Sequence, residues 1–472
     1  MTNSQNAVPG EVQPDASEII AAHLAALTYE KLPQNAVTTA KASILDTLGC
    51  AFAGTGTSEY AKVLELVTHW GGRPCSTVIG AGGLKVPPDN AVLANAATVH
   101  QYDFDDTHDV AICHPSSASV IPGLAIAEEV GGLSGKDFIT LVTGVNDFTS
   151  RIGLAIKGRL IDYPWFRAPV VGIFGSAAAS AMARGASAEQ HLETLGLTLP
   201  LVSGTLASLH HPGSSVRSMR DGLVYRNGVL AAELAMRGVH GDRGVFDGPY
   251  GFYKAFMRGE YKRNELVDEL GTRFEGERLS LKPWPSILML HPSLTVVTEI
   301  MRAQSLQFED IAEVMLGVGE VNLGRCHPVE VGSVPGKRMD LLHNLPFAVG
   351  ALLKHKTLPL ALYSNGKLAD EVIIKAMPKV RWKYDARHNG RTMEPAHVQI
   401  TTVKGSIYSG ECVKALGHPD NPMSDAQRHA KFMDCARAAA RPVPEVTAHA
   451  IIETIERLET LPDVRLLINL LA

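Results

Sequence analysis

The chain has 472 residues, of which 45% are hydrophobic and 20% charged, which is typical of a globular protein large enough for two or three domains. Its net charge of −5, with no long basic run, argues against nucleic-acid binding, and no apolar run approaches the ~18 residues of a membrane span. The six cysteines form no CxxC pair and the first thirty residues lack lysine and arginine, so we expect reduced thiols in a cytoplasmic protein.

Apolar residues at helical spacing dominate the first 260 residues. Gly49 inside one expected helix and the many small residues of 172–187 indicate helices that pack closely. The expected helices span 17–27, 37–53, 60–70, 88–98, 118–130, 136–157, 170–184, 188–207 and 226–237.

The pattern changes near residue 275, where β-branched residues begin to alternate with polar ones. Strands are expected within 310–320, 371–382 and 396–404, with helices at 292–304 and 340–355, and the chain becomes helical again after Asp425. The fold class is therefore mainly α with an inserted α+β domain. We divide the chain into a helical domain (1–274), an α+β lid domain (275–414) and a helical return (415–472), and expect the site in the crevice between them.

The segment from His100 to His114 packs four aspartates, three histidines and a threonine into fifteen residues between two apolar runs. Burial of so many polar and titratable groups costs free energy unless they pair with one another or bind a ligand. Three interpretations remain open: a capped helix end, a metal site, or an acid–base site for a small anion. A calcium loop fits poorly, because His108 and His114 stand where that loop needs Gly and Glu.

This segment is also the strongest part of a resemblance to the MmgE/PrpD family, whose members include 2-methylcitrate dehydratase, cis-aconitate decarboxylase and iminodisuccinate epimerase. Further pieces follow in the same order along nearly the whole chain. The pieces are His100-x-x-Asp-Phe-Asp-Asp-Thr107, His114-Pro-Ser-Ser117, Ile44-Leu-Asp-Thr-Leu-Gly49, Gly172-Ile-Phe-Gly-Ser-Ala-Ala178, Gly248-Pro-Tyr-Gly-Phe-Tyr253, Lys282-Pro-Trp-Pro285 with His291, and Leu345-Pro-Phe-Ala-Val349.

The resemblance implies a large helical domain with a small α+β lid, a homodimer, and an enzyme that needs no organic cofactor. It also implies a small di- or tricarboxylate substrate with a carbon acid next to a carboxylate. The family positions carried over unchanged are the expected catalytic residues Asp103, Thr107, His114 and Lys282.

Two family positions differ here. Phe166 stands where the family commonly has a histidine, and Arg217 stands where it has a lysine. In addition, no tyrosine occurs near Leu323, where decarboxylases often carry one. These differences argue against cis-aconitate decarboxylase and 2-methylcitrate dehydratase as the activity.

We assign His114 as general base or acid, oriented by Asp103, with opposing effects that bring its pKa near the working pH. Lys282 would act as a point charge, while Arg217 and Arg220 would clamp substrate carboxylates. The remaining substrate-binding candidates are Phe166 and, through their amides at the helix start after Pro115, Ser116 and Ser117.

Some of these residues could instead have purely structural roles. Arg220 and Asp221 could form a surface ion pair, and His100, His108 and His291 are expected to be structural. We expect no catalytic metal. The predicted function is a cofactor-independent lyase or isomerase that abstracts a proton next to a carboxylate; the alternative is a family member that has lost catalysis and only binds a carboxylate. Dehydration, epimerisation and decarboxylation stay open.

Overall fold

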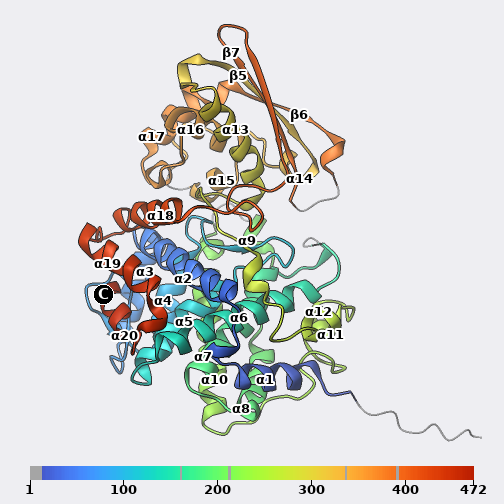
Figure 1. Cartoon of the computed structure of the whole chain (residues 1–472), viewed down its shortest axis with the longest axis vertical. Helices are drawn as coiled ribbons and strands as arrows, with labels where there is room; N and C mark the ends of the chain where they lie inside the picture. Colours follow the sequence, from blue (N-terminus) through green and yellow to red (C-terminus); the bar gives the residue numbers. More distant parts are fainter. Residues whose placement is uncertain (1–12, 160–161, 211–213, 335–336, 390–392) are drawn as a thin grey trace, which may run out of the picture.

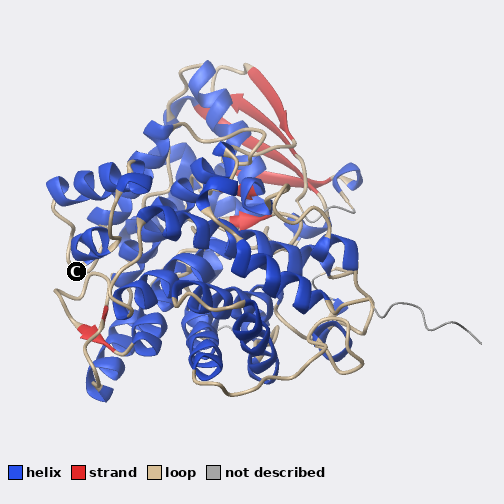
Figure 2. Cartoon of the chain, turned by 60° about the horizontal axis from the view of Figure 1, so that its bottom comes forward, coloured by secondary structure: helices blue, strands red, loops and turns tan. Residues whose placement is uncertain are grey.

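The computed structural model describes residues 13–159, 162–210, 214–334, 337–389 and 393–472. Most of the described chain is helical, and a four-stranded sheet lies at one end of the molecule (Figures 1 and 2). Among the described residues, none of the helices combines the length and the hydropathy needed to cross a lipid bilayer.

In the described residues up to Ser280, the first helical part contains twelve α-helices and two short strand pairs. Its central helices pack directly on one another, α10 against α4 and α7, and α5 against α6 and α7. The elements are α1 (Ala16–Ala26), α2 (Gln34–Thr55), α3 (Ser58–Trp70), β1 (Ser76–Thr77), β2 (Lys85–Val86), α4 (Pro88–Val99), β3 (Thr107–His108), α5 (Pro115–Glu129), α6 (Gly135–Ala155), α7 (Arg167–Ala183), α8 (Ala188–Thr198), α9 (Ala207–His210), α10 (Val216–Met236), α11 (Phe252–Phe256), α12 (Arg263–Val267) and β4 (Leu279–Ser280).

Close helix packing explains Gly49 and Gly172, as expected. A Cβ on Gly49 would lie 3.2 Å from Cδ2 of Phe432, so α2 and α18 approach closely there. A Cβ on Gly172 would lie 2.7 Å from the ring of Tyr225, which brings α7 and α10 together. The close-packing interpretation of Gly49 and of 172–187 is therefore confirmed.

The α+β part contains a four-stranded sheet in the order β6-β5-β7-β8, covered on one face by helices (Figure 1). Strands β5 and β6 run parallel, whereas β5 with β7 and β7 with β8 are antiparallel. Helix α13 packs against β7 and β8, and α16 against α13 and β6. The elements are α13 (His291–Ala303), β5 (Ile311–Val318), α14 (Glu320–Leu323), α15 (Arg338–Leu342), α16 (Leu345–His355), α17 (Gly366–Lys375), β6 (Val380–Tyr384), β7 (Ala396–Thr402) and β8 (Ile407–Cys412).

The chain then returns to the helical part through α18 (Asp425–Arg437), α19 (Glu445–Glu456) and α20 (Arg465–Ile468). Helices α18 and α19 pack on α2, and α20 packs on α5 (Figure 1). The predicted fold class, mainly α with an α+β domain, is confirmed. The boundaries at 274 and 414 stay a proposal; the segment just after 274 pairs with the helical part, because β4 hydrogen-bonds to β3.

Several predicted elements differ from the structure. Ile373 and Ile374 lie on helix α17, whose start is capped by the side chain of Asn365, rather than on the strand predicted for 371–382. Strand β8 was not predicted. The helix predicted for 340–355 is broken at His343 and Asn344, where the Asn344 side chain caps a new helix by accepting a hydrogen bond from the amide of Phe347.

Candidate active site

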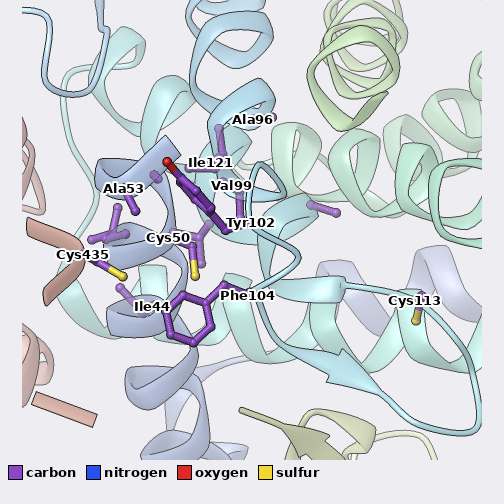
Figure 3. Close-up of a cluster of buried hydrophobic side chains, with 14 of the residues drawn as sticks. Ile44, Cys50, Ala53, Ala96, Val99, Tyr102, Phe104, Cys113, Ile121 and Cys435 are labelled. Atoms are coloured by element: carbon purple, nitrogen blue, oxygen red, sulfur yellow. The ribbon is translucent and has the colours of Figure 1, made fainter. Parts of the chain in front are cut away.

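The loop between α4 and α5 is anchored by two aromatic side chains. Tyr102 and Phe104 are buried, and Figure 3 shows them over α2, close to Ile44 and Cys50. Asp103 lies between them in sequence and adopts a φ of +47°, a left-handed conformation that non-glycine residues seldom take. Ile112 in the same loop has a φ of +56°, which is still rarer for a β-branched residue. Strain of this kind, about 1–3 kcal/mol per residue, is typical of functional loops.

Asp103 is the centre of a buried charge cluster. One carboxylate oxygen, Oδ1, accepts a hydrogen bond of 2.6 Å from Nζ of Lys282. The other, Oδ2, accepts from Arg217 at 3.2 Å and from Nε2 of His343 at 3.1 Å. Burial alone would raise the pKa of Asp103, but Lys282, His100, His343 and Arg217 outweigh it and hold this pKa well below its usual range. Asp103 is therefore ionised, and its donors hold it in place.

His114 is oriented through Nδ1. This nitrogen lies 2.6 Å from the main-chain oxygen of Asp106, an acceptor only, so Nδ1 carries the proton and Nε2 keeps a lone pair. The carboxylate of Asp105 lies 3.3 Å from the same nitrogen. Burial lowers the pKa of His114 to about 4, although Asp105 opposes the shift. The imidazole is thus neutral at pH 7 and can act as a proton acceptor.

Two expectations about His114 are corrected by this geometry. Its carboxylate partner is Asp105, not Asp103, because Asp103 is turned towards Lys282 and Arg217. Its pKa does not stay near the working pH, because desolvation outweighs the neighbouring carboxylate.

A pocket of about 100 Å³ lies beside this cluster, a size suited to a small organic molecule. Six predicted site residues come together on its wall, although they are up to 179 positions apart in sequence. They come from the loop after α4, the start of α7, the start of α10 and the segment after β4, while Arg325 and Met393 belong to the α+β part. The described lining residues are His100, Asp103, Thr107, Asp109, Ile112, His114, Phe166, Ala168, Arg217, Lys282, Ile287, Leu288, Met289, Arg325 and Met393.

Three predicted substrate-binding residues do not line the pocket. The Ser116 hydroxyl donates to the carboxylate of Asp106, and the Ser117 hydroxyl lies 3.1 Å from that of Tyr225. Both serines are buried at the start of α5. Their side chains therefore hold the loop and helix together from behind the pocket.

Arg220 lies behind Phe166, with its guanidinium carbon 4.4 Å from the centre of that ring. It pairs with Asp221 at 3.3 Å, and both side chains are at most 3% exposed. The alternative of a surface ion pair is therefore wrong. Arg220 adds positive charge near the site, screened from the pocket by Phe166.

The three histidines expected to be structural differ from one another. His108 bonds Glu275 at 3.2 Å and His291 lies beside Ser286, and neither lines the pocket. His100 does line it, and its Nδ1 lies 2.8 Å from Oδ1 of Asp105.

One cluster has the residue types of a metal site. Ligand atoms of His100, Asp105 and His114 all lie within 4.8 Å of one another. However, Nδ1 of His114 already donates to a main-chain oxygen, and Lys282 and Arg217 add positive charge on the same pocket wall. The arrangement fits a hydrogen-bonded network better than a divalent cation.

Two residues that sequence reasoning missed complete the cluster. His343, at the break between α15 and α16, donates to Asp103, and burial lowers the pKa of His343 to about 3. Asn344 followed by Leu-Pro is a helix-start signal that could have revealed the break. Arg325 lies just after α14 and lines the pocket; its sequence context offered no such signal.

A buried lysine on α18 holds two segments of the site together. Nζ of Lys431, on α18, donates to Asp46 at 2.6 Å and to the main-chain oxygens of Phe104 at 2.7 Å and Lys282 at 2.9 Å. Burial alone would lower the pKa of Lys431, but Asp46 and the other neighbours raise it. Lys431 is therefore charged and ties the Asp103 loop to the Lys282 segment.

Comparison with known sequences agrees with the resemblance described above. The sequence model of the MmgE/PrpD N-terminal domain matches residues 18–264, and that of the C-terminal domain matches residues 284–460. Cis-aconitate decarboxylases of Mus musculus and Homo sapiens are each 25% identical to this chain, over 96% of it and over 93% and 94% of their own lengths. That of Aspergillus terreus is 27% identical over 58% of both chains. The chain belongs to the MmgE/PrpD family and is an enzyme of that family's lyase or isomerase type.

Proposed function

We propose that this enzyme abstracts a proton from a carbon next to a carboxylate of a small di- or tricarboxylate, without a cofactor. The observation that supports this best is the state of His114. Its Nδ1 proton is held by a main-chain oxygen, its ring is neutral at pH 7, and it lies on the pocket wall. A neutral imidazole with a free Nε2 lone pair is a suitable general base.

In the proposed step, Nε2 of His114 takes the proton and the C–H electron pair moves into the adjacent carboxylate, which becomes an enediolate. The extra negative charge develops close to Lys282 and Arg217, whose positive charges stabilise it. Lys282 already has Asp103 as a fixed partner at 2.6 Å, so it is held in place before substrate arrives. Thr107, 3.3 Å from Nδ1 of His114, helps to fix the ring.

The enediolate can react further in two ways. Loss of a hydroxyl from the neighbouring carbon gives dehydration, and the proton that His114 has taken up can pass to this hydroxyl, which leaves as water. Epimerisation returns a proton to the opposite face of the carbon, and decarboxylation begins with C–C cleavage and protonates the resulting carbanion, so both need a separate proton donor. With a pKa of about 4, His114 is a weak candidate for that donor at pH 7. We therefore favour a dehydratase over an epimerase or a decarboxylase.

The relatives named as cis-aconitate decarboxylases support a polycarboxylate substrate, but they are only 25–27% identical to this chain. The residues at two family positions, Phe166 and Arg217, both line the pocket here. Arg217 keeps a positive charge but bonds Asp103, so we propose that it binds rather than transfers protons. Phe166 offers an apolar ring where a histidine could have acted as a second acid or base.

Incubation with di- and tricarboxylates in deuterated water tests this proposal. The wild-type enzyme should exchange deuterium into a carbon next to a carboxylate of at least one compound, and His114→Gln should lose this exchange. Binding of a carboxylate without exchange would instead support the alternative, a family member that no longer catalyses a reaction. We also propose a homodimer, following the family resemblance, and light scattering after gel filtration would measure its mass.

A further inference from the structure

Arg325 contributes a cation to the pocket from the α+β part. It follows helix α14, and its main-chain oxygen accepts a hydrogen bond of 3.1 Å from the amide of Leu345. The carboxylate of Glu394 accepts hydrogen bonds from the amides of Val321 at 2.6 Å and Asn322 at 3.1 Å. Glu394 neighbours Met393, the other pocket residue of this part, so one carboxylate holds both pocket elements in position.

The cations of the described pocket wall differ in their partners. Lys282 bonds Asp103 at 2.6 Å and Arg217 bonds it at 3.2 Å. Arg325, in contrast, has no carboxylate within 4.0 Å among the residues that the structure describes. The one other carboxylate of the described wall, that of Asp109, is bonded by the hydroxyl of Ser280 at 2.7 Å.

The partly buried guanidinium of Arg325 lacks a carboxylate partner among the described residues, and this makes it a favourable site for an anion. Burial lowers the pKa of Arg325, and the field of Asp103 only partly offsets this. A partly desolvated guanidinium gains most from a planar anion that accepts two hydrogen bonds, and a carboxylate has that geometry. Arg325 is therefore ready to receive a carboxylate that none of the described residues supplies.

The rest of the described wall is largely apolar. It includes Ile112, Phe166, Ile287, Leu288, Met289 and Met393. Alkyl surface removed from water by such a wall contributes about 0.8 kcal/mol per methylene, whereas a charged group placed against it would lose its hydration. The wall thus favours an alkyl branch on the substrate over an additional carboxylate.

We propose that Arg325 binds one carboxylate of the substrate, and that the substrate is a dicarboxylate carrying a small alkyl branch. The proposal rests on the proposed function in one respect, the position of the other carboxylate of the substrate. That carboxylate would lie at Lys282 and Arg217, and the carbon next to it would face His114. The α+β part then selects the substrate, while the helical part carries out the chemistry.

A matched series of ligands tests both halves of the proposal. Maleate, citraconate and cis-aconitate share the cis-butenedioate core and carry hydrogen, methyl or carboxymethyl at one carbon. Calorimetry with the wild-type protein should give the tightest binding for citraconate. If cis-aconitate binds tightest, the alkyl branch is overturned.

Arg325→Gln should weaken binding of citraconate and maleate by about 10- to 100-fold, the usual worth of a hydrogen-bonded charge. Arg325→Lys should retain part of the affinity, because it keeps the charge. The control is Arg381→Gln, which removes an exposed arginine of β6 in the same part of the chain and should bind like the wild type. Melting temperatures should match among the variants, since Arg325 has no described carboxylate partner to lose.

Unchanged binding in Arg325→Gln, or an equal loss in Arg381→Gln, would overturn the role of Arg325. The outcome is separable from that of the proposed reaction. Deuterium exchange is measured with saturated di- and tricarboxylates, because citraconate has no sp3 C–H next to a carboxylate. If citraconate binds through Arg325 but none of the saturated compounds shows deuterium exchange, the binding role stands and the reaction proposal fails.

Discussion

Replacing Lys431 with methionine should destabilise the protein strongly, although this residue lies outside the pocket. The ammonium makes three hydrogen bonds of 2.6–2.9 Å, and its side chain and that of its counter-ion Asp46 are 5% and 4% exposed. Methionine keeps most of the volume but leaves Asp46 buried without its cation. Breaking a buried pair in this way costs about 3–5 kcal/mol. Two main-chain oxygens also lose a donor, so we expect a loss in the upper half of that range.

Urea denaturation followed by fluorescence and by circular dichroism would measure the change in unfolding free energy. Lys157→Met is a matched control, because Lys157 pairs with Glu260 at 3.6 Å with 48% and 79% of the side chains exposed. Removal of such a surface pair should cost about 0–1 kcal/mol. Since whole proteins are stable by only about 5–15 kcal/mol, the difference between the two variants should be plain.

A second substitution separates the charge from the packing. In Lys431→Met with Asp46→Leu, the uncompensated carboxylate is gone, and the double variant should recover a large part of the about 3–5 kcal/mol that the broken pair costs the single one. A loss below about 1 kcal/mol in Lys431→Met would refute the reasoning. A double variant no more stable than the single one would attribute the cost to lost packing and main-chain contacts rather than to the buried charge.

Three further outcomes are expected. His114→Gln should lower deuterium exchange by ~10²–10⁴-fold. His108 bonds Glu275 away from the pocket, so His108→Ala should lower exchange much less. The reverse order would mean that the wrong histidine was assigned as the base. Exhaustive chelation should leave activity unchanged, and a loss restored by one divalent ion would overturn the metal-free proposal. Burial lowers the pKa of His191 to about 4, while the unfolded chain titrates near 6.5. The unfolded state therefore binds more protons between these two pH values, and the stability that is present above pH 6.5 is lost as the pH falls to 4. His191→Leu should remove on the order of 1–3 kcal/mol of this pH dependence of the unfolding free energy. Urea midpoints at pH 7 and pH 4.5 would measure it.

The sequence was most informative where neighbouring residues decide the structure. Helical periodicity located α1 to α7 to within a few residues, and Pro115 marked the start of α5. Two predictions were wrong at one end: α10 begins at Val216 rather than at 226, and α8 ends at Thr198 rather than at 207. Sequence patterns failed where tertiary contacts decide. Ile373 and Ile374 are β-branched but lie on α17, because the Asn365 cap and the packing of this helix against α16 outweigh their strand preference.

The same distinction separates the site residues that were found from those that were missed. Asp103, Thr107 and His114 belong to one loop and could be recognised together, and Lys282 followed from a family motif. His343, Arg325 and Lys431 reach the same place from three separate elements. The hydrogen-bond partners of the His343 and Lys431 side chains lie 149 to 385 positions away, and such pairings depend on the packing of whole helices. No local spacing encodes them.

Asp103 and Asp105 lie in the same loop but bind different partners, and the backbone conformation of Asp103 decides which partners each one has. Asp103 and Asp105 are equally spaced about Phe104, and the sequence favours neither as the partner of His114. The positive φ of Asp103 turns it towards Lys282, Arg217 and His343, which leaves Asp105 for the two histidines, His100 and His114. Both carboxylates have a lowered pKa, but Asp103 holds the cations that we propose to stabilise the enediolate, while Asp105 orients the proposed base. Because one carboxylate cannot face both sets of partners, the strained backbone at Asp103 is the means by which the loop separates the two roles.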